Sequence, residues 1–217
     1  WFKTLGTADG FGPRTVQILV ENNKSKLEDV YLPYKPKRRT RATIAREKGL
    51  EPLADLILQQ PMEGTPEVAA QLFVNPEKEV ADLDAALKGA RDIVAETVSE
   101  QSQIRQMVRD ALMQKGILAS SVTSEFKEKR SRFEQYYEFC EPIKDIPSHR
   151  FLAIRRGERE GALRVTIELD ADPMKQRMLG IMDMVKGSPF AAQLVESVGD
   201  AYARLLLPSL ETDIRAE

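Results

Sequence analysis

The sequence predicts a mainly α-helical protein, a multi-helix bundle or array with one minor β element near residues 151–169. Prolines recur beside capping residues at helix starts, as in Thr65-Pro66 and Asn75-Pro76. Apolar side chains after these starts repeat every three or four residues, which places them on one stripe of a helix. Residues 162–169 alternate apolar and polar side chains instead, and this alternation is typical of a half-buried strand.

The first 50 residues divide into two predicted segments. Residues 1–26 contain a turn and a helix that starts at Pro13, and their origin is uncertain. Gly10-Phe11-Gly12 before that helix suits a phosphate-holding helix-hairpin-helix turn, although a plain turn is the simpler interpretation. Residues 27–50 are predicted to be an extended basic connector, because Pro33 and Pro36 restrict the residues before them, followed by a short helix that ends at Gly49.

Residues 51–140 are predicted to form a helical region. Pro52, Pro66 and Pro76 each mark a helix start, and the helix after Pro76 is expected to be the longest. Two apolar stripes support long helices before Gly116: Val80, Leu83, Leu87, Ala90 and Val94, then Ile104, Met107, Val108, Ala111 and Leu112. The segment 125–139 concentrates aromatic residues that predict an anchor in a core: Phe126, Phe133, Tyr136, Tyr137 and Phe139.

Residues 141–170 are predicted to hold the small β element. Leu163, Val165 and Ile167 would face the interior of a strand that needs a partner. Residues 151–154 supply that partner through a turn at 157–161, or else Ser148 caps a helix over the same residues. Residues 171–217 are predicted to be C-terminal helices that open at Asp172-Pro173 and Ser188-Pro189 and kink at Pro208.

The composition excludes several classes of protein. With 42% hydrophobic and 30% charged residues, the chain is neither disordered nor collagen-like. The single Cys140 excludes an internal disulfide and a cysteine zinc site, and the single His149 excludes a two-histidine metal site. No apolar run approaches the roughly 18 residues of a membrane helix. We therefore expect a soluble, cytoplasmic protein without membrane contact, metal or cofactor, and the start at Trp1 indicates a fragment.

The residue pattern also favours a protein without enzymatic activity. The sequence shows no obvious pair of a catalytic acid and base, no phosphate-binding loop and no cluster of metal ligands. Cys140 and His149 are nine residues apart, but no spacing typical of a Cys-His or Ser-His-Asp site is present. A structural role at a helix start is the simpler interpretation of His149.

Residues 31–50 carry the sharpest charge pattern of the chain. Seven cations lie there against the single Glu47, a local charge of +6, so the remaining residues carry −8 of the total −2. Tyr31 and Tyr34 flank the cluster and are suited to stacking on bases. The candidate nucleic-acid-binding residues are Tyr31, Tyr34, Lys35, Lys37, Arg38, Arg39 and Arg41. The alternative is a solvated connector whose cations pair with nearby acidic helices.

Several strings of this chain resemble the Tex family of bacterial transcription accessory proteins. The longest is Tyr31-Leu32-Pro33-Tyr34-Lys35-Pro36-Lys37-Arg38-Arg39-Thr40 within residues 27–54. Further similar strings are Ile146-Pro147-Ser148-His149-Arg150, Arg156-Gly157, Glu160-Gly161 and Leu207-Pro208-Ser209-Leu210-Glu211. The resemblance covers about residues 27–217 and implies the central helical region of such a protein, before an RNase H-like domain that this chain lacks.

This resemblance implies a cytoplasmic, non-enzymatic, nucleic-acid-binding protein that acts in transcription. Its partners would be the RNA or DNA backbone, contacted mostly through domains outside this chain, and the transcription machinery. The present chain would act mainly as a helical scaffold. The alternative is a spacer that binds protein and makes no nucleic-acid contact of its own.

Overall fold

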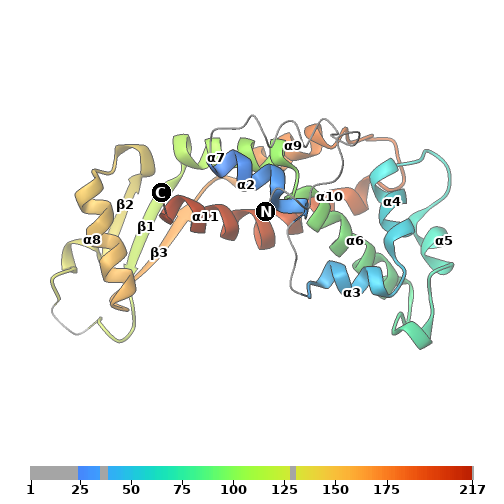
Figure 1. Ribbon diagram of the computed structural model, residues 1–217, viewed down its shortest axis with the longest axis horizontal. Coiled ribbons are helices and arrows are strands. Elements are labelled where there is room, and N and C mark those ends of the chain that lie inside the picture. Colours follow the sequence, from blue (N-terminus) through green and yellow to red (C-terminus); the bar gives the residue numbers. More distant parts are fainter. Residues whose placement is uncertain (1–23, 35–38, 128–130, 217) are drawn as a thin grey trace, which may run out of the picture. The chain divides into compact units, whose positions relative to one another are not determined.

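The computed structural model describes residues 24–34, 39–127 and 131–216, which divide into two units (Figure 1). Unit 1 comprises the described residues up to Gln106 together with Lys175–Leu206, and unit 2 comprises Met107–Met174 with the described residues from Leu207 onward. Unit 1 is helical, whereas unit 2 contains a three-stranded sheet. The predicted mainly α fold with a minor β element is confirmed.

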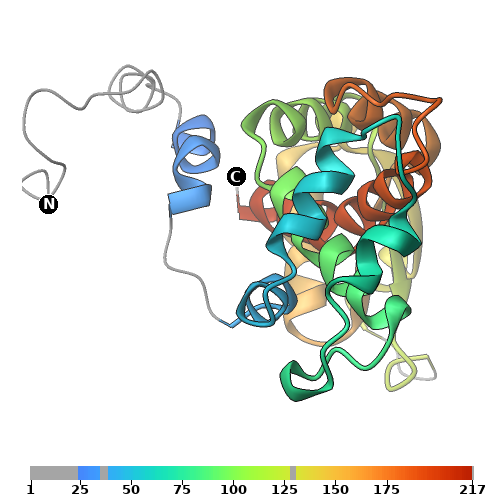
Figure 2. The ribbon, with the colours of Figure 1, turned by 90° about the vertical axis from the view of Figure 1, so that its right-hand side faces the viewer.

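Helix α6, Leu83–Ser99, is the central element of unit 1. It packs against α3 (Arg41–Glu47), α4 (Glu51–Gln59), α5 (Pro66–Gln71) and α10 (Ala191–Asp200), several of which face the viewer in Figure 2. The predicted stripe is buried at Leu87, Ala90 and Val94. A Cβ on Gly89 would lie 2.3 Å from Leu50 Cδ1, so the glycine lets the chain before α4 approach α6 closely.

Most predicted helix boundaries in unit 1 are confirmed. Thr65 accepts a hydrogen bond from the Val68 N–H and starts α5, and Gly49 adopts φ +84° directly after the C-cap of α3. The long helix predicted after Pro76 is present as α6, but its predicted start is wrong, because η3 (Pro76–Lys78) is a single 3-10 turn. Asn75 and Val80 close that turn with two backbone hydrogen bonds of 3.0 Å, and α6 begins only after its own cap, Asp82.

The extended connector predicted over residues 27–36 is also wrong where the structure describes it. Helix α2 runs over Lys24–Tyr31, and the 3-10 turn η2 covers Leu32–Tyr34. Pro33 restricts only Leu32 directly, so the helix continues up to the residue before it. A buried ion pair also stabilises the helix, because the Arg105 Nε donates a hydrogen bond to Asp29 Oδ1 at 2.5 Å and both residues are buried. Arg105 lies near the start of α7, Ser102–Lys115.

The sheet of unit 2 has the strand order β2-β1-β3, and both pairs are antiparallel. Its strands are β1 (Ile117–Val122), β2 (Glu138–Pro142) and β3 (Leu163–Glu168). Strand β3 alternates buried and exposed residues as predicted. Its partner is β1, so the hairpin with residues 151–154 is wrong. The predicted helical region 51–140 is likewise wrong for β1 and the start of β2, because Ala119, Ser120 and Ser121 give β1 little strand signal.

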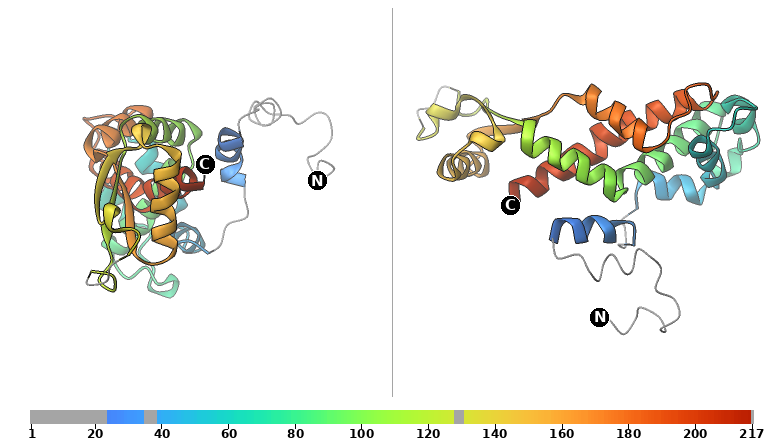
Figure 3. Two further views of the ribbon diagram at one scale, coloured as in Figure 1. Left: turned by 90° about the vertical axis from the view of Figure 1, so that its left-hand side faces the viewer. Right: turned by 90° about the horizontal axis from the view of Figure 1, so that it is seen from above.

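Residues 151–154 belong to helix α8, Ser148–Arg159, which lies across one face of the sheet (Figure 3, left). Ser148 is its first residue, and Pro147 occupies the cap position. The predicted aromatic anchor is confirmed, since Phe133 and Tyr136 are buried in one cluster with Ile154 and Leu163. A Cβ on Gly157 would lie 2.6 Å from Leu163 Cδ1, so this glycine sets how closely α8 approaches the sheet.

The C-terminal segment contains three helices and one π turn. Helix α9 covers Ala171–Ile181, and Asp170 accepts a hydrogen bond from the Asp172 N–H at its start. The π turn η6 (Ala201–Leu206) joins α10 to α11 (Leu207–Ala216), whose second residue is Pro208. Pro208 has no N–H for the Arg204 carbonyl four residues earlier, so the regular helical pattern is interrupted where the kink was predicted.

Helix α11 also covers the outer edge of β3. The Arg215 guanidinium donates to the Val165 carbonyl at 2.9 Å, and the Glu211 carboxylate accepts a backbone hydrogen bond from Ile167. These contacts satisfy main-chain groups on the side of β3 that faces away from β1. Among the described residues, no helix combines the length and the apolar character that crossing a membrane requires.

Candidate nucleic-acid interface

The short helix α3 and the residues just before it carry the described arginines of the basic cluster. Thr40 caps it in a reciprocal capping box, accepting from the Thr43 N–H at 3.0 Å while Thr43 Oγ1 accepts from the Thr40 N–H at 2.8 Å. Thr40 Oγ1 also donates to Glu96 on α6 at 2.9 Å. This double role fixes the first turn of α3 on α6, with Arg39 just before it and Arg41 at its first position.

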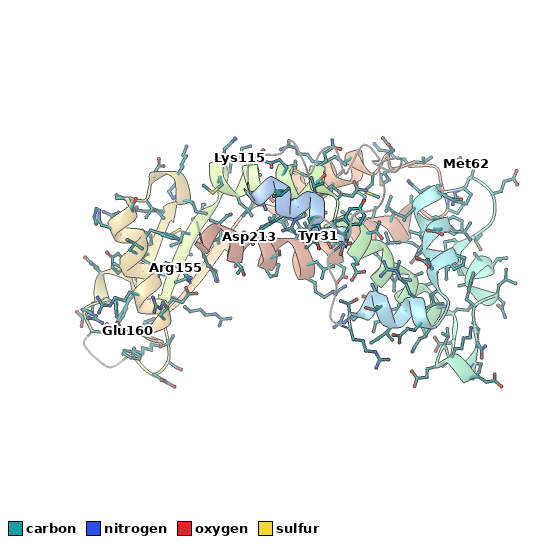
Figure 4. The ribbon with its side chains drawn as sticks, in the orientation of Figure 1. Tyr31, Met62, Lys115, Arg155, Glu160 and Asp213 are labelled. Atoms are coloured by element: carbon teal, nitrogen blue, oxygen red, sulfur yellow. The ribbon has the colours of Figure 1, made fainter. Side chains whose placement is uncertain are left out.

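The seven predicted contact residues fall into three groups. Lys35, Lys37 and Arg38 lie outside the described residues. Tyr31 ends α2 half-buried, and Tyr34 in η2 is 54% exposed (Tyr31 is labelled in Figure 4). Arg39 and Arg41 are exposed on the other side of the undescribed segment. The two tyrosines therefore lie on α2 and η2, whereas Arg41 begins α3 and Arg39 lies in a bend just before the N-cap of α3.

Three cations of residues 31–50 are held by acidic side chains. Arg39 Nη2 lies 3.1 Å from Glu47 Oε2, and Lys48 Nζ lies 3.2 Å from Glu79 Oε2. Arg46 Nη1 lies 2.6 Å from Glu96 Oε2, whose side chain is only 9% exposed. These pairs neutralise part of the +6 cluster, as the alternative interpretation of the sequence expects. The pairs of Arg39 and Lys48 are exposed and weak, so an anion in solution would readily replace their carboxylates. The pair of Arg46 with the buried Glu96 is not of this kind.

Among the described residues, Arg41 is not neutralised by a short ion pair, and it shares a pocket with Lys88, a residue that the sequence did not indicate. Arg41 and Lys48 from α3 and its C-cap line a surface pocket of about 260 Å³ together with Lys88 from α6. Within the part of the chain that the structure describes, neither Arg41 nor Lys88 forms an ion pair shorter than 4.0 Å. Two elements thus present cations to one concave surface. Lys88 is 47 positions from Arg41, and no local pattern links them.

Asp92 lies at the acidic side of this pocket. Burial raises the pKa of its carboxyl above the ordinary 3.8, whereas the positive charge of Arg204, which donates to it at 3.0 Å, acts to lower that pKa. Asp200 raises the Asp92 pKa, and the more distant charges of Arg41 and Lys88 lower it. Arg204 is shared between Asp92 and Asp200, so the Asp92 carboxylate offsets part of the positive potential from Arg41 and Lys88.

The described residues show no group of three or more His, Cys, Asp and Glu side chains arranged to hold a metal ion. His149 lies in the first turn of α8 and is exposed, and Cys140 is exposed on β2. Neither is part of the pocket around Arg41. The chemistry that this pocket offers is therefore electrostatic: attraction of an anion by cations on a rigid helical support.

The described residues thus form a helical unit and a unit with a three-stranded sheet, and a pocket of the helical unit is lined by Arg41, Lys48 and Lys88. Residues 62–217 match the family described as Tex central region-like. The chain is 50% identical over 151 residues to protein YhgF of Escherichia coli and 45% identical over 156 residues to protein tex of Bordetella pertussis. It is 38% identical over 193 residues to protein YdcI of Bacillus subtilis. The chain belongs to the Tex family, as the resemblance in its sequence implied.

These relatives are much longer than this chain. The aligned regions cover 70%, 72% and 88% of the chain but only 19%, 20% and 27% of YhgF, tex and YdcI, respectively. The chain thus spans about a fifth to a quarter of the length of these proteins. A human protein named S1 RNA-binding domain-containing protein 1 is 26% identical over 207 residues, which cover 88% of the chain and 20% of that protein.

Proposed function

We propose that this chain is the helical scaffold of a non-enzymatic, cytoplasmic transcription accessory protein and that its Arg41 and Lys88 surface contacts the phosphate backbone of RNA or DNA. The observation that carries the proposal is the convergence of these two cations, without short ion pairs among the described residues, on one pocket. Names of the relatives, a transcriptional accessory protein in Neisseria gonorrhoeae and an S1 RNA-binding protein in humans, fit such a role.

The contact is expected to be independent of base sequence. Arg41 and Lys88 stand on helices that pack against each other, so both cations reach a backbone without ordering a loop. Lysine and arginine neutralise phosphates and release counterions, which gives affinity that falls with salt. Arg39 is a further candidate contact, because its ion pair with Glu47 is exposed and a phosphate can readily replace the carboxylate.

The test compares the chain with the double variant Arg41→Gln, Lys88→Gln in a mobility-shift titration on mixed-sequence RNA and DNA at low salt. The variant should bind about fivefold more weakly, because two phosphate contacts are lost. The matched control Lys115→Gln, Lys144→Gln removes two exposed lysines of unit 2 and should bind like the unchanged chain. Equal titration curves for both double variants would remove the site assignment.

A second candidate function, a spacer that binds only protein, is favoured by the ion pairs of Arg39, Arg46 and Lys48. In that case the chain alone would show no nucleic-acid affinity at low salt, while a longer protein of the family would still bind.

A further inference from the structure

The outer face of α8 in unit 2 combines arginines with one exposed leucine. His149, Leu152, Arg156 and Arg159 are exposed and follow one another at spacings of three, four and three residues, so they form one stripe of the helix. The opposite side holds Ile154 and Gly157, which are buried against the sheet. The close approach at Gly157 fixes the rotation of α8, and the stripe therefore faces away from the sheet core.

Positive charge exceeds negative charge on this face. Glu160 is shared by Arg132 and Arg156, both of which donate hydrogen bonds to it. Arg155 pairs with Glu158, which also lies 3.5 Å from Arg215. Arg159 forms no ion pair among the residues that the structure describes. The guanidinium groups of Arg132, Arg155, Arg156 and Arg159 thus stand against two carboxylates (Arg155 and Glu160 are labelled in Figure 4).

Leu152 lies among these arginines and is 66% exposed. It lines a surface depression of about 530 Å³ together with Arg155, Arg156, Arg159 and Glu160. A single exposed leucine is ordinary on a protein surface. A leucine in a depression bordered by guanidinium groups differs, because a partner that neutralises the arginines also covers the apolar side chain. Burial of Leu152 then adds to the electrostatic attraction.

The same geometry distinguishes a peptide from a nucleic acid. Stacking of bases is strongest on the large rings of phenylalanine, tyrosine and tryptophan, but Phe133 is 4% exposed with the Arg132 guanidinium 5.0 Å from its ring centre, which leaves the small imidazole of His149 as the exposed ring of the stripe. Phe139 is half-buried with Arg150 at 5.9 Å. A phosphate backbone would also gain nothing from Leu152. Carboxylates and phosphates both match the fork of arginine, and the pairs with Glu158 and Glu160 show the carboxylate case on this same face. The preference for a peptide therefore rests on Leu152.

We propose that the face formed by Leu152, Arg155, Arg156 and Arg159 binds an acidic peptide segment that carries one apolar side chain. The carboxylates of the peptide pair with Arg156 and Arg159, and its apolar side chain packs on Leu152. This site lies in unit 2 and does not depend on the nucleic-acid contact proposed for unit 1.

The experiment uses fluorescence polarisation of the full chain with a labelled peptide of about 12 glutamate and aspartate residues around one central leucine, at about 50 mM salt. The chain should bind this peptide about tenfold more tightly than a peptide in which serine replaces the leucine. The variants Leu152→Ser and Arg156→Gln with Arg159→Gln should each weaken binding about tenfold.

The matched control is Arg164→Gln, which removes an exposed arginine from the opposite face of the sheet and should change affinity less than about twofold. Circular dichroism of each variant confirms that α8 is retained. Failure of the leucine peptide to bind would overturn the proposal. So would binding as tight as that of the unchanged chain by Leu152→Ser or by the variant Arg156→Gln with Arg159→Gln. So would tighter binding of a mixed-sequence RNA of the same length through these residues, because that result would make the face a general polyanion site.

Discussion

Replacing Ile154 and Leu152 one at a time tests how the sequence from 151 to 154 folds. In a helix these two residues point to nearly opposite sides, about 200° apart, whereas in a strand they share one face. Ile154 is fully buried in the cluster with Phe133, Tyr136 and Leu163, and Leu152 is 66% exposed. The helical structure therefore predicts very different costs for two alanine substitutions only two positions apart.

Ile154→Ala removes three buried carbon atoms from a packed cluster and should lower the free energy of unfolding by about 3 kcal/mol. Leu152→Ala removes mostly solvent-exposed atoms from α8 and should change it by less than about 0.5 kcal/mol. Urea unfolding followed by circular dichroism measures both values on the same chain. Similar losses from both substitutions would contradict the helix, because only a strand places both side chains in the core.

Three further predictions concern contacts inside one unit or the other. Thr40→Ala should cost about 1 to 2 kcal/mol in urea unfolding, since it removes the cap of α3 and a hydrogen bond to Glu96. In an NMR titration Glu160 should have a pKa below 4.5, because hydrogen bonds from Arg132 and then Arg156 favour its ionised form. Its contribution to stability is present above pH 4.5 and is lost as the pH falls through the folded pKa, and Arg132→Gln should raise that pKa. Asp92 should titrate above 3.8 and higher still in Arg204→Gln; its contribution is present below pH 3.8 and is lost as the pH rises through the raised pKa.

Local sequence signals predicted the elements that depend on neighbours in the chain. Thr65 with Pro66, Asn75 with Pro76 and Gly49 each act where their chemistry predicts, because caps and left-handed residues are decided within one turn. The alternation of β3 was equally local. By contrast, strand β1 escaped prediction since its small and polar residues become a strand only through pairing with β2 and β3.

Helix α2 was also missed because a contact distant in sequence stabilises it. Helix α2 was predicted to be extended on the evidence of Pro33 and Pro36, but its buried contact joins Asp29 to Arg105, 76 positions away. A pairing over that separation leaves no periodic trace in the sequence. Tertiary contact therefore decides the conformation of a segment whose local propensities are mixed.

The candidate site likewise contains residues that local sequence predicted and residues that only the packing of helices brings together. Arg39 and Arg41 were found from the clustering of charge within 20 residues, which is visible in any sequence. Lys88 joins Arg41 only because α3 packs on α6, and the pairing of Arg46 with the buried Glu96 depends on the same packing. Charge composition thus located the region, but which cations remain accessible was decided by the fold.

The salt dependence of RNA binding tests the proposed phosphate contact most directly. For the unchanged chain and for Arg41→Gln with Lys88→Gln, the logarithm of the association constant is measured against the logarithm of the salt concentration on one single-stranded RNA. Because each neutralised phosphate of a single strand contributes about 0.7 to the slope, the double variant should show a slope smaller in magnitude by about 1.4. Identical slopes for the two proteins would mean that Arg41 and Lys88 touch no phosphate, and the account of this surface would be wrong.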